Sequence, residues 1–474
     1  MNAMKPSSFL VPAVRWDREG QRHVDLGAVL NLAWPMFLNS ALQAVLNLTD
    51  TWFVSRISTE ATAAVGAIFF LVMMCLFVVG GVGLGIQTLV AQAYGAGQRD
   101  QAARVTWAAL WLSLATTPLC GLFAALSFPI LHPFGLASGI ETQALAFWGP
   151  RLWGGPFSVA LWALTGFFNG ISQPRITLLI MAITAIGNVF FNALCINVFG
   201  LGVAGAAYGT TLAQLLGVIV GLAIFLGPTF QRSFETRQHW RSKAKDFLKV
   251  IHMGVPTGLF PAVDVIGFAL FQMMMSKLGA IDGAATQLVM MLTSIGYLPS
   301  IGIGMAGTTL VGQSIGAGDR EWAMKLGNRT ILIAMAYMGG LGLIFAWLGP
   351  AMLAGFIDPL DPNGPATLAL ASGLLWVAAG YQLFDAINLV CAFCLRGAGD
   401  VRVPTVWLLL ASWLFFLPLT HALSFASGEG YVNFLPQYGW GALGGWIAAL
   451  IYILLLAVML FARWRSGAWK RISI

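Results

Sequence analysis

The chain has 474 residues, of which 58% are hydrophobic and only 9% are charged, and its formal net charge is +7. A soluble protein carries about 25% charged residues to cover its surface, so this composition excludes a soluble fold. Collagen-like, disulfide-rich and disordered chains are also excluded, because there is no Gly-X-Y period, only five cysteines and no polar tract. We therefore expect an all-α integral membrane protein.

Long apolar runs follow one another along the chain, and each is long enough to span a bilayer, which takes about 20 helical residues. None alternates as a strand does, and a helix satisfies its backbone hydrogen bonds internally. The sequence therefore predicts twelve transmembrane helices, at 27–54, 61–90, 106–130, 142–168, 176–199, 202–228, 250–276, 286–314, 328–355, 366–395, 403–425 and 440–462.

The basic residues are distributed unevenly between the two sides of the membrane. Of the 25 Lys and Arg residues, all but Arg56, Arg151 and Lys277 fall on the side that carries both termini. An excess of basic residues marks the cytoplasmic side, so both termini are expected there. The same distribution makes the lipid bilayer the expected partner and argues against nucleic acid, and we interpret the basic run at 229–249 as a solvated loop.

A repeat divides the chain into two halves of six helices each. Residues 90–104 read VAQAYGAGQRDQAAR and residues 311–325 read VGQSIGAGDREWAMK, and each copy follows the second apolar run of its half. Parallel repeats of this kind are used by transporters that carry substrate between two bundles. The expected organisation is a tail at 1–26, an N-lobe at 27–228, a linker at 229–249, a C-lobe at 250–462 and a tail at 463–474.

Three acidic residues, Asp50, Asp264 and Asp385, lie inside predicted helices, where a carboxylate costs about 2.5–3.5 kcal/mol on insertion scales. The simplest reading is a side chain that only bonds a neighbouring helix. Their polar neighbours instead recur at helical spacing, which places each set on one face. These sets are Asn39, Gln43, Asn47 and Asp50; Tyr381, Asp385 and Asn388; Asn188 and Asn192; and Asp264 and Gln272.

No Lys or Arg lies within these polar stripes, so the positive partner is expected from outside: a proton, a metal cation or an organic cation. Oxygen ligands suit a hard ion such as Na⁺, and removal from water favours the neutral form of a carboxyl group. Three prolines, Pro35, Pro256 and Pro261, lie in the helices that carry Asp50 and Asp264. They predict either a static bend or a hinge beside an ion site.

Sequence signatures of enzymes are missing, so we expect no enzyme activity and no cofactor. There is no Walker A motif, H-E-x-x-H or G-x-S-x-G, and GGVGLGIQ at 80–87 lies within a helix rather than after a strand. Cys391 and Cys394 have C-x-x-C spacing, but no second pair follows and no histidine is near. Met and Phe residues are expected mostly to pack or face lipid, and some in a cavity would suit flat organic cations.

The order of several motifs resembles the multidrug and toxic compound extrusion (MATE) family over almost the whole chain. The matching segments are NLTDTWFVSR at 47–56 with Pro35 before it, VAQAYGAG at 90–97, NGISQPR at 169–175, GVP at 254–256, LPSIGIGMAGTTLVGQSIGAG at 298–318 and YQLFDAINLVCAFCLRGAGD at 381–400.

The resemblance implies a monomeric antiporter of the bacterial inner membrane that expels small organic cations in exchange for Na⁺ or H⁺. It assigns ion or proton coupling to Asp50, Asn188, Asn192 and Thr210 in the first half, and to Tyr381, Asp385 and Asp264 in the second half, where the last three also form a candidate Na⁺ site. The cavity would be lined by Asn39, Gln43, Asn47, Gln272 and Asn388. Asp385 favours the NorM-like branch, whereas Asp264 stands where that branch usually has Glu.

Other functions remain open on the sequence alone. The same scaffold could export or flip a lipid-linked precursor or another metabolite that is not a drug, although such a cargo would favour basic rather than acidic cavity residues. An intramembrane enzyme would need a nucleophile and base within the helices. A channel would not need two lobes with an ion site in each.

Overall fold

The computed structural model describes residues 11–134, 136–356 and 362–472, so parts of the two predicted tails, 1–10 and 473–474, lie outside the described residues. The first half contains a short hairpin and eleven α-helices: β1 Val14–Trp16, β2 Arg22–Val24, α1 Leu26–Ser55, α2 Thr59–Leu84, α3 Ile86–Gly95, α4 Arg99–Ala115, α5 Thr117–Ala125, α6 Ser127–Leu131, α7 Ser138–Trp153, α8 Gly155–Gly170, α9 Pro174–Ala193, α10 Gly202–Phe225 and α11 Pro228–Phe234.

The second half is mainly helical in its described part, with a loop at 425–440 before its last long helix. Its elements are α12 Ala244–Leu278, α13 Ala280–Gly316, α14 Arg320–Ala354, α15 Gly364–Gly397, α16 Arg402–Leu410, α17 Leu417–Ser424 and α18 Gly441–Ser466. Four short helical segments complete the chain: η1 His132–Phe134, η2 Leu194–Val198, η3 Ala411–Phe416 and η4 Ala468–Arg471.

These helices confirm the predicted all-α membrane fold. Eleven helices of the described chain are long and apolar enough to span a bilayer. The one predicted span not among these eleven, 142–168, is present as two consecutive helices, α7 and α8, that meet at Gly154. A glycine at this junction is required by packing, because a Cβ there would collide with the side chain of Thr211 on α10. The chain is therefore a multi-pass membrane protein.

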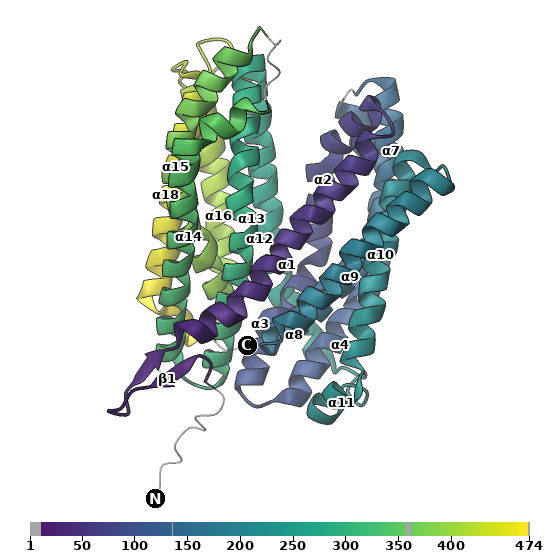
Figure 1. Cartoon of the computed structure of the whole chain (residues 1–474), viewed down its shortest axis with the longest axis vertical. Helices are drawn as coiled ribbons and strands as arrows, with labels where there is room; N and C mark the ends of the chain where they lie inside the picture. The colour runs from purple at the N-terminus through teal and green to yellow at the C-terminus, as the bar shows by residue number, and fades with distance from the viewer. Residues whose placement is uncertain (1–10, 135, 357–361, 473–474) are drawn as a thin grey trace, which may run out of the picture.

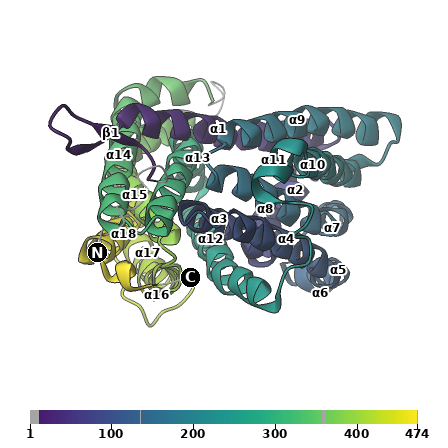
Figure 2. The same cartoon turned by 90° about the horizontal axis from the view of Figure 1, so that it is seen from below.

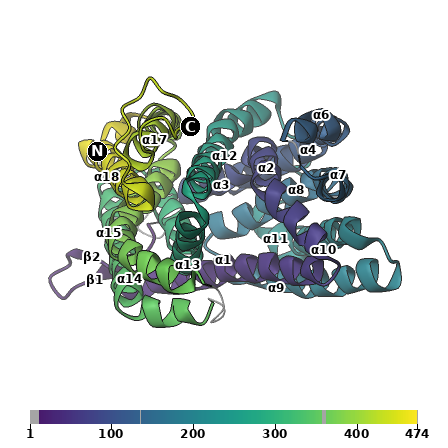
Figure 3. The same cartoon turned by 90° about the horizontal axis from the view of Figure 1, so that it is seen from above.

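The helices form two bundles, and the first helix of each half connects them (Figure 1). The first part of α1, around Met36, packs in a core with α13 and α14, whereas its last part, around Val54, packs with α10. Helix α12 does the reverse: Val250 packs in the core of the first half and Phe271 in the core of the second. Figures 2 and 3, along the long axis, show α1 extending from the α13–α14 group to α9 and α10.

The bundles meet most closely at the end of the molecule that carries both chain termini, called here the terminal end. At this end the two copies of the repeated motif pack against one another. A Cβ on Gly95 would collide with the backbone of Gln313, and a Cβ on Gly316 would collide with the backbone of Gln92. The repeat therefore places its Gly where two backbones touch, which only a residue without a side chain permits.

A second close approach joins the bundles through α2 and α12. A Cβ on Gly81 would lie 2.9 Å from the Cα of Gly258 and would also collide with the carbonyl oxygen of Gly254. Both are backbone atoms and cannot move aside as a flexible side chain would. Small residues at helix interfaces in membranes allow this kind of backbone contact.

We predict that Gly81→Ala lowers the thermal stability of the purified protein, because the added methyl forces α2 and α12 apart at a cost of about 1–3 kcal/mol. Gly66→Ala on the same helix is the matched control, since a Cβ there meets no atom within 4 Å and alanine favours the helix by about 1 kcal/mol. Thermal unfolding followed by size-exclusion chromatography checks both variants. Equal melting temperatures for the two would contradict the α2–α12 contact.

Candidate functional site

The first acidic cluster is built around Asp50, near the end of α1. Its Oδ1 accepts hydrogen bonds from Nδ2 of Asn188 at 2.9 Å and from Nδ2 of Asn192 at 2.7 Å, both on α9. Its Oδ2 accepts a hydrogen bond from Oγ1 of Thr210 on α10 at 3.0 Å. The structure therefore brings together the four residues that the sequence assigned to this lobe, and neutral donors surround the carboxylate.

The cluster is tight because small residues let α9 and α10 pack closely. A Cβ on Gly209 would lie 2.9 Å from the backbone nitrogen of Asn192, and the fully buried Asn188 also accepts from Nδ2 of Asn192 at 3.2 Å. Asn188 and Asn192 lie one turn apart on α9, which is why both amides reach the same carboxylate.

The remaining polar residues of the α1 stripe do not contact Asp50. Gln43 and Asn47 are exposed, and Asn39 is half-buried with an Oδ1 that has no hydrogen-bond partner in the described part of the chain. Their spacing still places them on the Asp50 face of α1, so the cavity-lining role stays a prediction for these three residues.

The second acidic cluster lies in the other bundle, between α12 and α15. Asp385 is only 3% exposed, and its Oδ1 accepts a hydrogen bond from Nδ2 of Asn388 at 3.2 Å. Asp264 on α12 lies within electrostatic reach of Asp385, and no Lys or Arg in the described chain acts on either carboxylate. Tyr381, one turn before Asp385, faces the same pair.

Two further tyrosines belong to this cluster, and the sequence analysis missed them. Tyr297 on α13 and Tyr452 on α18 both lie within electrostatic reach of Asp264 and Asp385. Tyr452 stacks on Phe416 with ring centroids 4.6 Å apart. Neither tyrosine shares a helix with Asp264 or Asp385, so spacing along the sequence could not have linked them to the site.

The donor set of the second cluster fits a hard cation. Two buried oxygen atoms, Oδ2 of Asp385 and Oδ1 of Asn388, have no hydrogen-bond partner among the described residues. Leaving such atoms unpaired costs about 1–3 kcal/mol each. Carboxylate, amide and hydroxyl oxygens are ligands that Na⁺ accepts. The described chain holds no cluster of three or more His, Cys, Asp and Glu side chains placed to hold a metal ion.

Gln272 takes no part in the second cluster. Its Nε2 is hydrogen-bonded to the carbonyl oxygen of Gly283 on α13 at 3.3 Å and to Oγ of Ser276 at 3.4 Å. The side chain therefore connects α12 to the start of α13, two turns beyond Asp264. Helical spacing placed Gln272 on the right face, but the face alone does not decide which neighbour a long side chain reaches.

The three prolines lie within continuous helices, Pro35 in α1 and Pro256 and Pro261 in α12. Near Pro256 the helix gains an outside contact, because Oγ1 of Thr405 donates to the Pro256 carbonyl at 3.1 Å. The hinge role of these prolines stays a prediction.

One statement from the sequence needs correction. No basic residue lies in the polar stripes themselves, but Arg151 is buried within α7, only 7% exposed, and its charge interacts with Asp50. The sequence analysis counted Arg151 only among the basic residues away from the side of the termini, and it did not connect this residue with Asp50. Only the packing of α7 against α10 turns this residue inward.

At the terminal end, glutamines connect the two bundles through hydrogen bonds that the sequence did not predict. Nε2 of Gln92 donates to the carbonyl oxygen of Gly397 at 2.9 Å, and Nε2 of Gln313 donates to that of Gly170 at 2.7 Å. Gln92 and Gln313 occupy the same place in the two repeats. The repeat is the feature of the sequence that could have predicted these bonds, because a glutamine at the same position in both copies suggests the same structural role.

Other bonds reinforce this contact, and we call the whole set the terminal-end closure. Nε2 of Gln87 on α3 donates to Oγ1 of Thr309 at 2.9 Å and to the carbonyl oxygen of Met305 at 2.8 Å. Oγ1 of Thr309 donates in turn to the carbonyl oxygen of Asn169 at 3.0 Å. Buried polar groups of both bundles are thus satisfied only while the bundles are in contact here.

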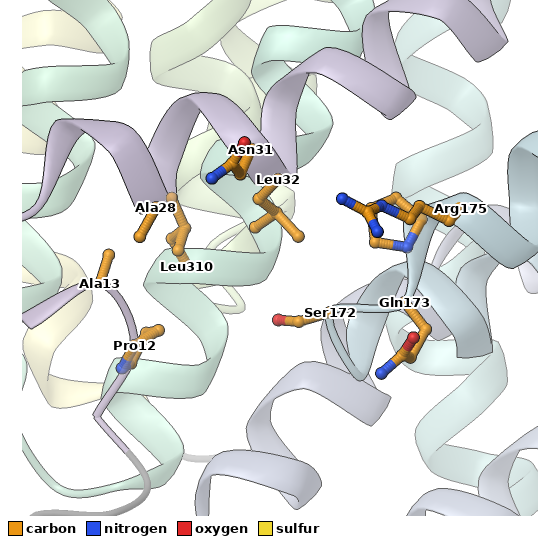
Figure 4. A pocket seen from close by; sticks show the side chains of 10 residues that line it. Pro12, Ala13, Ala28, Asn31, Leu32, Ser172, Gln173, Arg175 and Leu310 are labelled. Atoms are coloured by element: carbon orange, nitrogen blue, oxygen red, sulfur yellow. The ribbon is translucent and has the colours of Figure 1, made fainter.

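Two open grooves lie at the terminal end, away from the acidic clusters. One, of about 440 Å³, opens between α1 and the loop before α9, and its polar lining comes from Asn31, Ser172 and Arg175 (Figure 4). The other, of about 580 Å³, is lined by residues that include Arg22, Lys325, Arg329 and Arg465. Neither groove contains Asp50, Asp264 or Asp385.

Comparison with known proteins places this architecture in a family. The MatE family model matches residues 35–194 and 256–421. The chain is 27% identical over 454 residues to a probable multidrug resistance protein NorM from Mesorhizobium japonicum, covering 93% of each protein. It is 28% identical over 437 residues to a protein of the same description from Pseudomonas aeruginosa, covering 90% of this chain and 88% of the relative.

Solved structures agree on the fold. A MATE crystal structure in complex with MaL6 superposes with a TM-score of 0.82 at 19% identity, covering 94% of this chain and 97% of the other. An outward-facing multidrug resistance MATE transporter of the MOP superfamily gives 0.81 at 19% identity and full coverage of both chains. The fold, together with the family model over both halves, leads to one conclusion: this chain is a member of the MatE family.

Proposed function

We propose that this protein is a multidrug efflux antiporter, which expels small organic cations across the bacterial inner membrane in exchange for Na⁺ or H⁺. The observation that carries the proposal is the pair Asp264 and Asp385, two acids in the membrane interior without a Lys or Arg partner in the described chain. Such a pair needs a cation that the protein does not supply. The probable multidrug resistance proteins similar to this chain support the cargo class.

Within this proposal the second cluster binds the coupling ion. Asp385 and Asp264 provide the charge, and Asn388 and Tyr381 provide neutral oxygen atoms. Asp50, held by Asn188, Asn192 and Thr210, is the polar centre of the other lobe. An ion and an organic cation that compete for the same carboxylates are coupled by linkage alone, since binding one releases the other.

Transport requires the lobes, 27–228 and 250–462, to open alternately to the two sides. The terminal-end closure supports the view that this conformation is shut on the side of the termini, which positive charge assigns to the cytoplasm. Pro35, Pro256 and Pro261 lie in α1 and α12, the two helices that cross between bundles. Bending there would let each crossing helix follow one lobe at each end.

Acidic clusters distinguish the proposed cargo from a phosphate-bearing one. A flippase for a lipid-linked precursor would have to neutralise phosphate with basic groups. The interior clusters instead carry three acids, Asp50, Asp264 and Asp385, against the single buried Arg151. The balance favours cationic cargo.

The direct test is efflux of a fluorescent organic cation from proteoliposomes, with a Na⁺ gradient and a pH gradient imposed separately. We expect at least one gradient to drive efflux against the concentration gradient of the dye, because the proposed mechanism exchanges cations. A protein that moves dye equally with and without either gradient would contradict antiport.

We expect Asp385→Asn to lower gradient-driven efflux by roughly tenfold or more, because the amide removes the charge that holds the ion, and tenfold corresponds to about 1.4 kcal/mol of coupling. Expression and membrane insertion should be unchanged, since the amide is isosteric. The control is Asp100→Asn, which removes a carboxylate paired with Arg104 on the same helix, outside the cluster. If Asp385→Asn transports as well as this control, Asp385 has no coupling role.

A further prediction concerns the terminal-end closure. Gln313→Leu leaves the carbonyl of Gly170 without its donor and should shift the population toward a state open at the terminal end. In a background whose five native cysteines are replaced, Ala91→Cys provides one alkylation site, because Ala91 is buried on α3 beside Gly312 of α13. We expect its labelling in membranes to rise several-fold. Gln98→Leu, on an exposed side chain of the first repeat, should leave labelling unchanged. No change in either variant would show that these bonds do not hold the gate.

A further inference from the structure

Arg151 is an unusual residue for the interior of a membrane protein. Its side chain is 7% exposed, and its Nη1 has no hydrogen-bond partner among the described residues. A buried arginine normally forms two or more hydrogen bonds with an acid or with carbonyl groups. The cost of burying an unpaired charge is high, so a compensating charge has to be close.

Arg151 and Asp50 are connected through contacts with α10. The carbonyl oxygen of the preceding residue, Pro150, accepts a hydrogen bond from Oγ1 of Thr211 at 3.4 Å. The next residue along α10, Thr210, donates to Asp50 at 3.0 Å. Asp50 is the carboxylate of the described chain whose charge acts on Arg151, although the two groups form no direct ion pair. Neighbouring residues of α10 therefore contact both Asp50 and the residue before Arg151.

Comparison of the two halves shows that Arg151 has no basic counterpart at the equivalent position of the second half. Gly170 ends α8 and Gly397 ends α15, and both accept the bond from the repeat glutamine of the opposite half. These glycines are 227 residues apart, and the same offset pairs Arg151 with Ala378 and Ser158 with Asp385. Helix α15, which carries Asp385 in the second half, thus corresponds to the span α7–α8 of the first half, which carries Arg151.

The net charge of the two clusters differs as a result. Asp50 and Arg151 sum to zero in the first bundle, whereas Asp264 and Asp385 sum to minus two in the second. A cluster that is already neutral gains little from an external cation, and a cation entering it meets repulsion from the guanidinium. A cluster of two acids has to acquire positive charge from outside.

We propose that Arg151 is the built-in counter-cation of Asp50, and that it confines coupling-ion binding to Asp264 and Asp385. Arg151 is a positioning residue for charge, which determines how many cations the transporter takes up. The inference deepens the proposed antiport and rests on it. Without Arg151, Asp50 is a second lone carboxylate and binds a cation of its own.

The experiment measures cation binding to purified protein, so it does not depend on transport. The starting variant is Asp264→Asn with Asp385→Asn, which removes the second cluster. We expect it to bind no radioactive Na⁺ and to show no infrared band of a buried protonated carboxyl group, because Asp50 is already compensated. Adding Arg151→Met should create roughly one equivalent of bound Na⁺ or such an infrared band.

Three further variants assign the new signal. Asp50→Asn on top of Arg151→Met should abolish it, which shows that the acquired cation belongs to Asp50. Arg151→Lys should not create it, because a charge remains while the guanidinium geometry is lost. Arg396→Met, in place of Arg151→Met, removes an arginine whose guanidinium lies over Phe393 and on which no acid of the described chain acts. Arg151 remains in this variant, so no Na⁺ binding and no carboxyl band should appear. Size-exclusion chromatography establishes that every variant is folded.

The outcomes separate the two proposals. Na⁺ binding or a carboxyl band that persists in the starting variant, with Arg151 intact, overturns the assignment of the coupling ion to the second cluster alone. A starting variant without signal that stays silent after Arg151→Met overturns the role of Arg151 and leaves the antiport proposal standing. The same signal after Arg396→Met would also overturn it, since it would show a general effect of removing interior charge.

Discussion

A carboxylate inside a membrane bundle needs a positive charge, because lipid cannot hydrate it and neutral donors only partly replace water. The two acidic clusters of this chain differ in how far they meet this requirement. Asp50 receives three hydrogen bonds from neutral groups and the field of Arg151. Asp385 receives one hydrogen bond and keeps an oxygen without a partner. The carboxylate of the first cluster is therefore better compensated than those of the second, and the proposed binding of the coupling ion follows from this difference.

The bundles are joined by devices that the internal repeat supplies twice. Each copy contributes a glycine that allows backbone contact and a glutamine that donates to a carbonyl group of the other bundle. Hydrogen bonds of this kind are worth about 1 kcal/mol each, which is small enough for ligand binding to overcome. The close backbone contacts of the repeat glycines add to these bonds, so packing and hydrogen bonds together hold the two bundles at the terminal end.

Duplication explains the architecture, and departure from symmetry explains the chemistry. α1 and α12 both begin in the opposite bundle and end in their own, as related first helices of two repeats would. The acids do not follow this symmetry, since Asp50 lies near the end of α1 while Asp264 lies in the middle of α12. The two lobes have therefore kept a common fold while their charged groups diverged.

The sequence by itself determined the class of fold and the number of spans, because the length of an apolar run sets a span, and helical spacing placed Asn188 and Asn192 one turn apart. The link of Asn188, Asn192 and Thr210 to Asp50 came from the resemblance to the MATE family. Tertiary structure decided what depends on contacts between distant segments. It placed Tyr297 and Tyr452 within electrostatic reach of the acids, turned Gln272 toward Gly283, and buried Arg151 within α7, where its charge acts on Asp50. Periodicity gives the face of a helix that a side chain occupies, but the neighbour it meets there is set only when the helices pack.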